Sequence, residues 1–146
     1  MTQQVIGVGS AANDKTGDPY RTAFQKVNAN FVEVYGIAVN KTIVPSTAPA
    51  VLAATDSGKV YTNEGDADGV ALTLPTAVAG YEFKFIVKVA QTLSVIASAG
   101  DTIRIAASVS AAGGSISSAT IGNAITLVSI NATEWMAVST VGTWTI

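Results

Sequence analysis

The chain has 146 residues, of which 49% are hydrophobic and 12% are charged; its net charge is −2, and it has no histidine or cysteine. These absences exclude disulfides and thiolate metal sites and remove the commonest general base, and the slight negative charge argues against nucleic-acid binding. Soluble domains typically carry about 25% charged residues. Because the chain also lacks the apolar run of about 18 residues that a membrane-spanning helix needs, we expect partner subunits to bury its charge-poor surface.

Residues 1–17 are mostly small, polar or glycine, which predicts an extended arm with little core of its own. The pattern changes at Asp18 and Pro19, which suit the N-cap and the first position of a helix. We expect this helix to span 18–35 and to end at Gly36, where a C-cap glycine belongs.

The predicted helix carries one apolar stripe with residue spacings of four, three, four and three. This heptad-like spacing fits a helix that packs on its own domain, and it also fits a helix that packs against its copies around an axis. The low charge of the chain favours the second interpretation. We therefore expect an oligomer interface formed by Tyr20, Phe24, Val27, Phe31 and Val34.

The segment 36–58 contains Pro45 and Pro49, and it predicts an irregular linker with room for a short strand at 41–44. From residue 59 to the end, strand and turn patterns follow one another at short intervals. The clearest is the period-two alternation over 81–89; further strands are expected at 59–62, 70–74, 92–97, 101–106, 115–121, 124–130, 134–141 and 143–146.

The chain is therefore predicted to be mainly β, with an N-terminal extended arm and one helix. Because no helical pattern separates the strands, we expect residues 59–146 to form an antiparallel β-sandwich or small barrel. The segments 125–130 and 135–141 are almost uncharged on both faces. Exposed at a sheet edge they would invite association, so we expect neighbouring chains to cover them.

No catalytic or cofactor-binding pattern is found, so an enzyme is not expected. The ten carboxylates show no spacing that pairs them, and no serine lies in a nucleophile-elbow motif. Glu64, Asp66 and Asp68 match the first half of a calcium loop, but Pro75 stands where the last ligand belongs. A connecting loop whose acids bind local backbone is preferred over a weak cation site.

Two further features concern side chains near the C-terminus. Trp135 and Trp144 are predicted to pack in the core or at a subunit interface, and the alternative is stacking on the sugar rings of a receptor. Asp101 and Arg104 point to opposite faces if their strand is regular, and they can pair only if a turn lies at Asp101.

Residues 6–31 read IGVGSAANDKTGDPYRTAFQKVNANF. This segment resembles a motif near the N-terminus of fibre and appendage proteins of tailed phages. The motif has the approximate form IGxxxNDGTGDPLRTAFxKINxNF, so Lys15 here replaces a common glycine and Tyr20 a common leucine.

The resemblance implies a homotrimer on the exterior of a phage head or tail, attached to a capsid or tail protein through residues 1–17. The chain is short and has no fibre shaft, which favours a head-decoration protein or head fibre over a small tail fibre protein. The alternative is a receptor- or carbohydrate-binding module of a tail fibre that binds a host surface glycan. Neither nucleic acid nor membrane insertion is implied.

Overall fold

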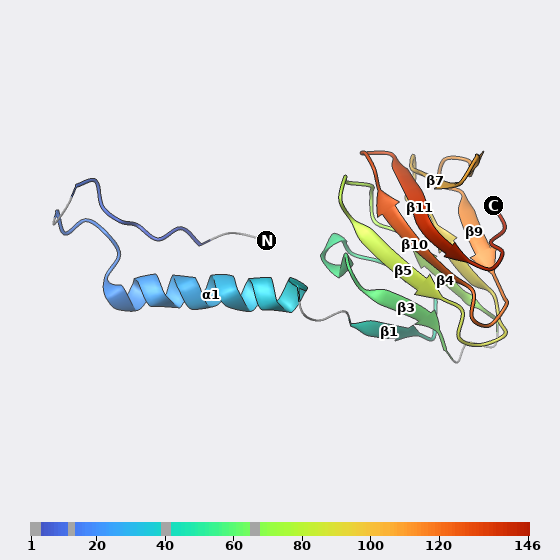
Figure 1. Ribbon diagram of the computed structural model, residues 1–146, viewed down its shortest axis with the longest axis horizontal. Coiled ribbons are helices and arrows are strands. Elements are labelled where there is room, and N and C mark those ends of the chain that lie inside the picture. The colour runs from blue at the N-terminus through green and yellow to red at the C-terminus, as the bar shows by residue number, and fades with distance from the viewer. Residues whose placement is uncertain (1–3, 12–13, 39–41, 65–67) are drawn as a thin grey trace. The chain divides into compact units, whose positions relative to one another are not determined.

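The computed structural model describes residues 4–11, 14–38, 42–64 and 68–146. The chain divides into an N-terminal unit, Met1–Lys41, and a β domain, Thr42–Ile146. The N-terminal unit consists of an extended arm followed by helix α1 (Tyr20–Ala38) (Figure 1). The helix begins slightly later than expected and continues through Gly36. One glycine inside a helix costs only about 1 kcal/mol, which is too little to end it.

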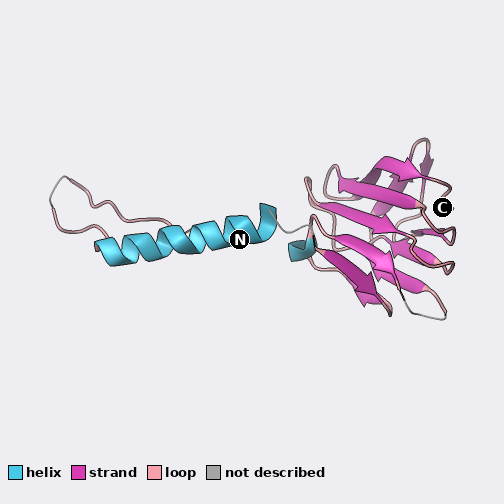
Figure 2. Ribbon diagram, turned by 60° about the horizontal axis from the view of Figure 1, so that its bottom comes forward, coloured by secondary structure: helices cyan, strands magenta, loops and turns pink. Residues whose placement is uncertain are grey.

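The β domain contains eleven strands in the described residues, arranged in two sheets (Figure 2). The larger sheet has the order β1-β3-β5-β10-β11-β7-β8, and the smaller has the order β2-β4-β6-β9. The strands are β1 (Ile43–Ser46), β2 (Ala50–Val51), β3 (Val60–Asn63), β4 (Val70–Thr73), β5 (Glu82–Ile86), β6 (Leu93–Ile96), β7 (Thr102–Ile105), β8 (Ser108–Val109), β9 (Ser115–Ser118), β10 (Ala124–Ser129) and β11 (Glu134–Val141).

The first six strands alternate between the two sheets, so that the chain winds through three successive coils of two strands each. After each strand the chain crosses to the other sheet and returns in the original direction. The neighbours β1–β3, β3–β5, β2–β4 and β4–β6 are therefore parallel. The expectation of a mainly antiparallel arrangement was wrong, because a strand of the opposite sheet makes the return that usually requires a helix.

The C-terminal strands add most of the antiparallel pairs. Strand β10 pairs antiparallel with both β5 and β11, and β9 pairs in the same way with β6. The strands expected from residue 59 onward are present, except that 143–146 contributes only a single bridge between Ser117 and Thr145.

The described part of the segment 36–58 contains more regular structure than the expected linker with a short strand at 41–44, which overlaps β1. Residues from 42 onward contain β1, β2 and a short 3-10 helix (Ala54–Asp56), and Leu52 is buried in the core. Strands β1 and β2 lie at the edges of their sheets. Pro45 lies within β1 and Pro49 directly precedes β2, and proline is tolerated at sheet edges, where it discourages further strand pairing.

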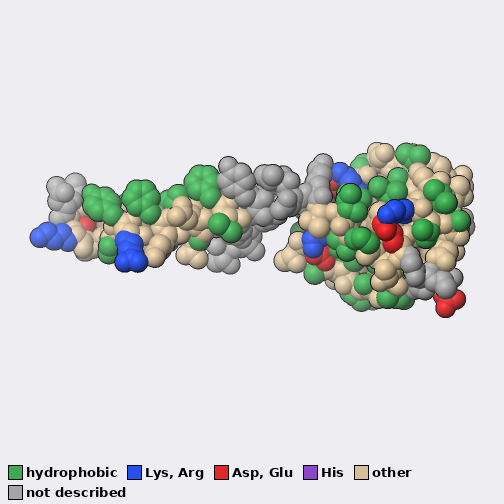
Figure 3. Space-filling view, turned by 90° about the horizontal axis from the view of Figure 1, so that it is seen from below, with side chains coloured by type: hydrophobic (Ala, Val, Ile, Leu, Met, Phe, Trp, Pro, Cys, Tyr) green, Lys and Arg blue, Asp and Glu red, His purple; other side chains and the backbone are tan. Residues whose placement is uncertain are grey.

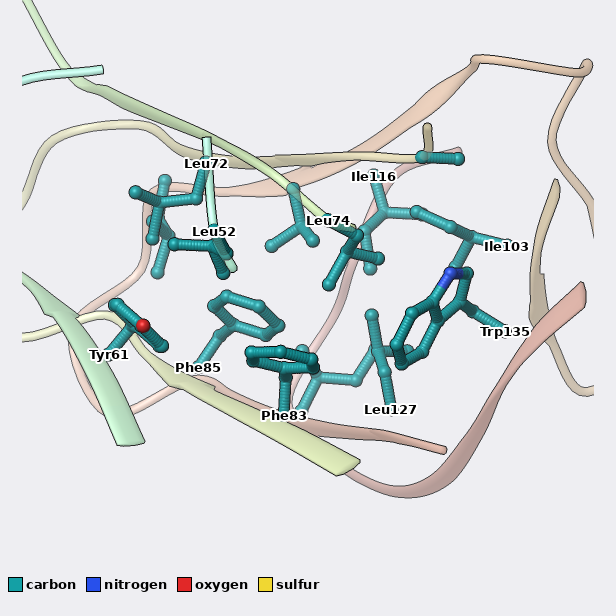
Figure 4. Packing of buried hydrophobic residues seen from close by; sticks show 14 of the residues in the cluster. Leu52, Tyr61, Leu72, Leu74, Phe83, Phe85, Ile103, Ile116, Leu127 and Trp135 are labelled. Carbon is teal, nitrogen blue, oxygen red and sulfur yellow. The ribbon is translucent and has the colours of Figure 1, made fainter. Parts of the chain in front are cut away.

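One apolar core lies between the two sheets, and aromatic rings from the larger sheet fill much of it (Figure 4). The rings of Tyr61 and Phe85 stack with centroids 5.9 Å apart, and Phe83 meets Trp135 edge-on at 5.6 Å. Leu72 and Leu74 contribute from the side of the smaller sheet and are fully buried. The alternation predicted over 81–89 is confirmed, because Phe83, Phe85 and Val87 point inward.

The two uncharged segments 125–130 and 135–141 differ in their place in the sheet. Strand β10 lies between β5 and β11, and β7 pairs only with Glu134–Met136 of β11. A place inside the sheet therefore explains the low charge of the first segment, whereas residues 138–141 at the end of β11 are exposed.

Buried polar side chains form hydrogen bonds that stabilise the connections between strands. The Asn63 amide accepts hydrogen bonds from the backbone of Lys88 and donates to the carbonyl of Gln91 (2.7 Å each). The Asp101 carboxylate is buried and accepts from the Ala77 amide (2.8 Å). Arg104 does not pair with Asp101, because its guanidinium binds Glu134 on the adjacent strand β11.

The core makes a direct stability prediction. Replacing Phe85 with alanine should lower the free energy of unfolding by roughly 3–5 kcal/mol, because a fully buried ring leaves a cavity. The matched control is Ile86→Ala on the partly exposed face of the same strand, which should cost about 1 kcal/mol or less. Chemical denaturation measures both values, and equal losses would contradict the assigned core.

Candidate functional site

The N-terminal arm runs back along α1 and is bound to it through one carboxylate, that of Asp18 (Figure 1). Its Oδ2 atom accepts hydrogen bonds from the Gly7 amide (2.8 Å) and from Lys26 Nζ (2.6 Å). The Asp18 amide in turn donates to the Gly7 carbonyl (2.8 Å). Asp18, which was expected to cap the helix, thus joins the arm to the first turns of α1.

Two side chains of α1, Lys26 and Asn30, form hydrogen bonds with residues nearer the start of the arm. Lys26 Nζ also donates to the Val5 carbonyl (2.9 Å). The Asn30 amide accepts from the Gln4 backbone N–H (2.9 Å) and donates to the Gln4 carbonyl (3.0 Å). Polar contacts with Asp18 and α1 therefore hold the arm over residues 4–7.

The close approach of the two halves of the arm depends on glycine. A Cβ atom at Gly17 would lie 2.9 Å from the Gly7 carbonyl oxygen, which is closer than side chains tolerate. Gly9 has a φ of 80°, a left-handed conformation that favours glycine, and a Cβ atom there would clash with the Asp14 carboxylate. Gly9 and Gly17 are therefore required by the backbone path of the arm.

The turn between the two halves of the arm is built around Asp14. Its carboxylate accepts from the amides of Ser10 (2.6 Å), Ala11 (2.8 Å) and Thr16 (2.9 Å). Lys15 follows with a φ of 59°, which is unfavourable for a residue with a side chain. Glycine would adopt this conformation without strain.

The hydrogen bonds of the arm stabilise the charged forms of both aspartates. Lys26 and the Gly7 amide hold the pKa of Asp18 below its ordinary value of 3.8. Hydrogen bonds from Thr16, Ala11 and Ser10 hold the pKa of Asp14 below the same value. Ionised carboxylates therefore favour the bound arm.

The predicted stripe is largely exposed to solvent. Figure 3 shows hydrophobic side chains along one edge of α1. Tyr20 is 88% exposed, Phe24 66% and Phe31 56%, whereas Val27 is partly buried. The structure thus brings the stripe together on one face. The arm lies beside it, over the side of the helix that carries Lys26 and Asn30.

The other predicted site residues are not assembled into a site. Glu64 is engaged by Lys88 (2.7 Å) and Thr62 (2.9 Å), which also lower its pKa, and Asp66 lies outside the described residues. In the described ranges no group of three potential metal ligands occurs. Trp135 and Trp144 are buried in the core, as the favoured prediction had it, and their rings are not presented to a sugar as the receptor-binding alternative requires.

Sequence reasoning missed Lys26 and Asn30 as functional residues. Both lie in the segment 6–31, and nothing in its pattern distinguished them from their neighbours. Their partners are backbone atoms of Val5 and Gln4, far away in the sequence, and no residue spacing reveals such contacts.

Comparisons with known proteins leave the family of the chain open. No family model matches it, and no match is found among curated proteins. No helix in the described part of the chain is long and apolar enough to cross a membrane.

The aspartates predict an acid-sensitive arm. Because their pKa values are lowered, their stabilising effect is complete above about pH 4 and declines as the pH falls through the lowered values. The protection factor of the Gly7 amide, measured by hydrogen exchange and NMR, should therefore fall on acidification. The double variant Asp14→Asn with Asp18→Asn should show weak protection at every pH, and undiminished protection of the native chain at pH 2 would contradict the assignment.

Proposed function

We propose that this chain is a homotrimeric structural subunit on the exterior of a tailed-phage virion. The N-terminal unit attaches the trimer to a capsid or tail protein, the helix stripe packs near the threefold axis, and the two sheets project as a sandwich. A head-decoration protein or head fibre is preferred over a small tail fibre protein. The observation that carries this proposal is the exposed heptad stripe on α1.

Burial of the exposed stripe between subunits would stabilise an oligomer considerably. Burying one large apolar side chain contributes about 1.5–3 kcal/mol, and Tyr20, Phe24, Phe31 and Val34 are all more than half exposed. A helix of 19 residues is also marginal in isolation. Packing against copies of itself would stabilise the helix and remove this surface from water.

The residue types along the stripe favour more than two copies. The heptad places Phe24 and Phe31 at a positions and Tyr20, Val27 and Val34 at d positions. β-branched residues at d disfavour two-stranded coils and favour three or four strands. A cyclic trimer is also what the resemblance to phage fibre and appendage proteins implies.

Attachment is assigned to the arm and helix acting together. Since Gly7, Val5 and Gln4 are bound to α1 through their backbones, the arm offers its side chains, and not its backbone, to a partner. Val5 and Val8 are 73% and 87% exposed. Three such units on one trimer would bind three equivalent sites, and weak individual contacts would add to firm retention. The glycan-binding alternative loses the two tryptophans on which it rested.

The stripe predicts the oligomeric state. Phe24→Asp combined with Phe31→Asp should convert the trimer to a monomer, because six carboxylates would be forced together near the axis. Light scattering coupled to size-exclusion chromatography measures the mass. The matched control is Val32→Asp, an exposed valine off the stripe, which should leave the trimer intact. A native monomer, or an unchanged mass in the double variant, would contradict the proposed interface.

The virion role predicts binding to particles. The full chain should be found by mass spectrometry in particles of the phage whose genome encodes it. It should also co-sediment with particles assembled without it, whereas the chain lacking residues 1–17 should remain in the supernatant. The Val32→Asp chain controls for unrelated surface changes. Absence from the particles would refute the virion role, and equal binding by the shortened chain would refute attachment through the arm.

A further inference from the structure

A hollow of about 180 Å³ lies on the surface of α1, lined by Val27, Asn30, Phe31 and Val34. These residues stand at positions i, i+3, i+4 and i+7 of one helix. In coiled coils this set of four forms the hole that receives one side chain, the knob, from a facing helix. The hollow is therefore a hole of the kind needed for helix pairing, located on the exposed stripe.

We infer that Phe31 of a second copy of this chain occupies the hollow, with the helices parallel and in register. In heptad terms the hole is formed by d, g, a and d residues, and in a parallel coiled coil such a hole takes the a residue of its neighbour. Phe31 is that residue, and it is 56% exposed. The inference rests on the proposed trimer, because copies related by a threefold rotation must have parallel helices along the axis.

The side chains on either side of Phe31 leave space for this knob. Val27 and Val34 are shorter than phenylalanine and lie one helical turn before and after it on the stripe. A ring inserted between them would contact both valines and the exposed ring of the receiving Phe31. Phe24 stands seven residues before Phe31, so the same register repeats the contact one heptad earlier.

The arm fixes one wall of the hole. Asn30 is the polar member of the lining, and its amide both accepts from and donates to the backbone of Gln4 (2.9 and 3.0 Å). These two hydrogen bonds set the orientation of the side chain that borders the incoming ring. Binding of the arm and self-association of the helix are therefore coupled through Asn30.

Engineered cysteines test the orientation, because the chain has none of its own. With Tyr20→Cys, parallel helices in register bring the two thiols of neighbouring copies together, and mild oxidation should give disulfide-linked dimers on a non-reducing gel. Gln25→Cys, on the opposite side of the helix, should give none. In an antiparallel pair centred on the hole, residues 20 of the two copies would lie more than about 20 Å apart, and no link would form.

The variant Phe31→Ala tests whether Phe31 of a second copy occupies the hollow. It should weaken self-association on the order of a hundredfold in sedimentation experiments, because both the knob and part of the hole are removed. Val32→Ala is the control and should leave the affinity within about twofold. A trimer that does not cross-link through Tyr20→Cys, or that tolerates Phe31→Ala, would overturn this inference and leave the proposed function standing. A monomeric native chain would overturn both.

Discussion

The N-terminal unit depends on the carboxylate of Asp18, which lies where the arm turns into the helix. Its Oδ2 atom receives both the Gly7 amide and the Lys26 ammonium group, and Lys26 reaches on to the Val5 carbonyl. The arm has no core of its own, so these polar contacts, together with those of Asn30, decide its path along α1. The orientation of Asn30, which borders the hollow on α1, follows from that path.

The sequence predicted the strands of the β domain well, because each strand is a local pattern of alternating side chains, as in Phe83 and Phe85. It did not predict how the strands pair. The alternation is the same whether a neighbour is parallel or antiparallel, and only the path between β1, β2 and β3 decides the direction. Pro45 and Pro49 were assigned to a linker because proline is equally at home in loops and at sheet edges.

The sequence predicted those residues of the candidate site that recur with the helical period. Spacing alone places Phe24 and Phe31 on one face of a helix, and the structure exposes that face. The contacts of Lys26 and Asn30 with arm carbonyls are not periodic and connect residues far apart in the sequence. The burial of Trp135 and Trp144 was favoured beforehand, but the residue type fits a core and a sugar-binding surface alike.

The coiled path of the β domain also bears on how such a chain can change in length. Each coil pairs with the coil before it, and β1 and β2 end the stack on one side. Gain or loss of one whole coil at that end would leave the direction of every remaining strand unchanged. Such a change would therefore alter the height of the domain in steps of one whole coil.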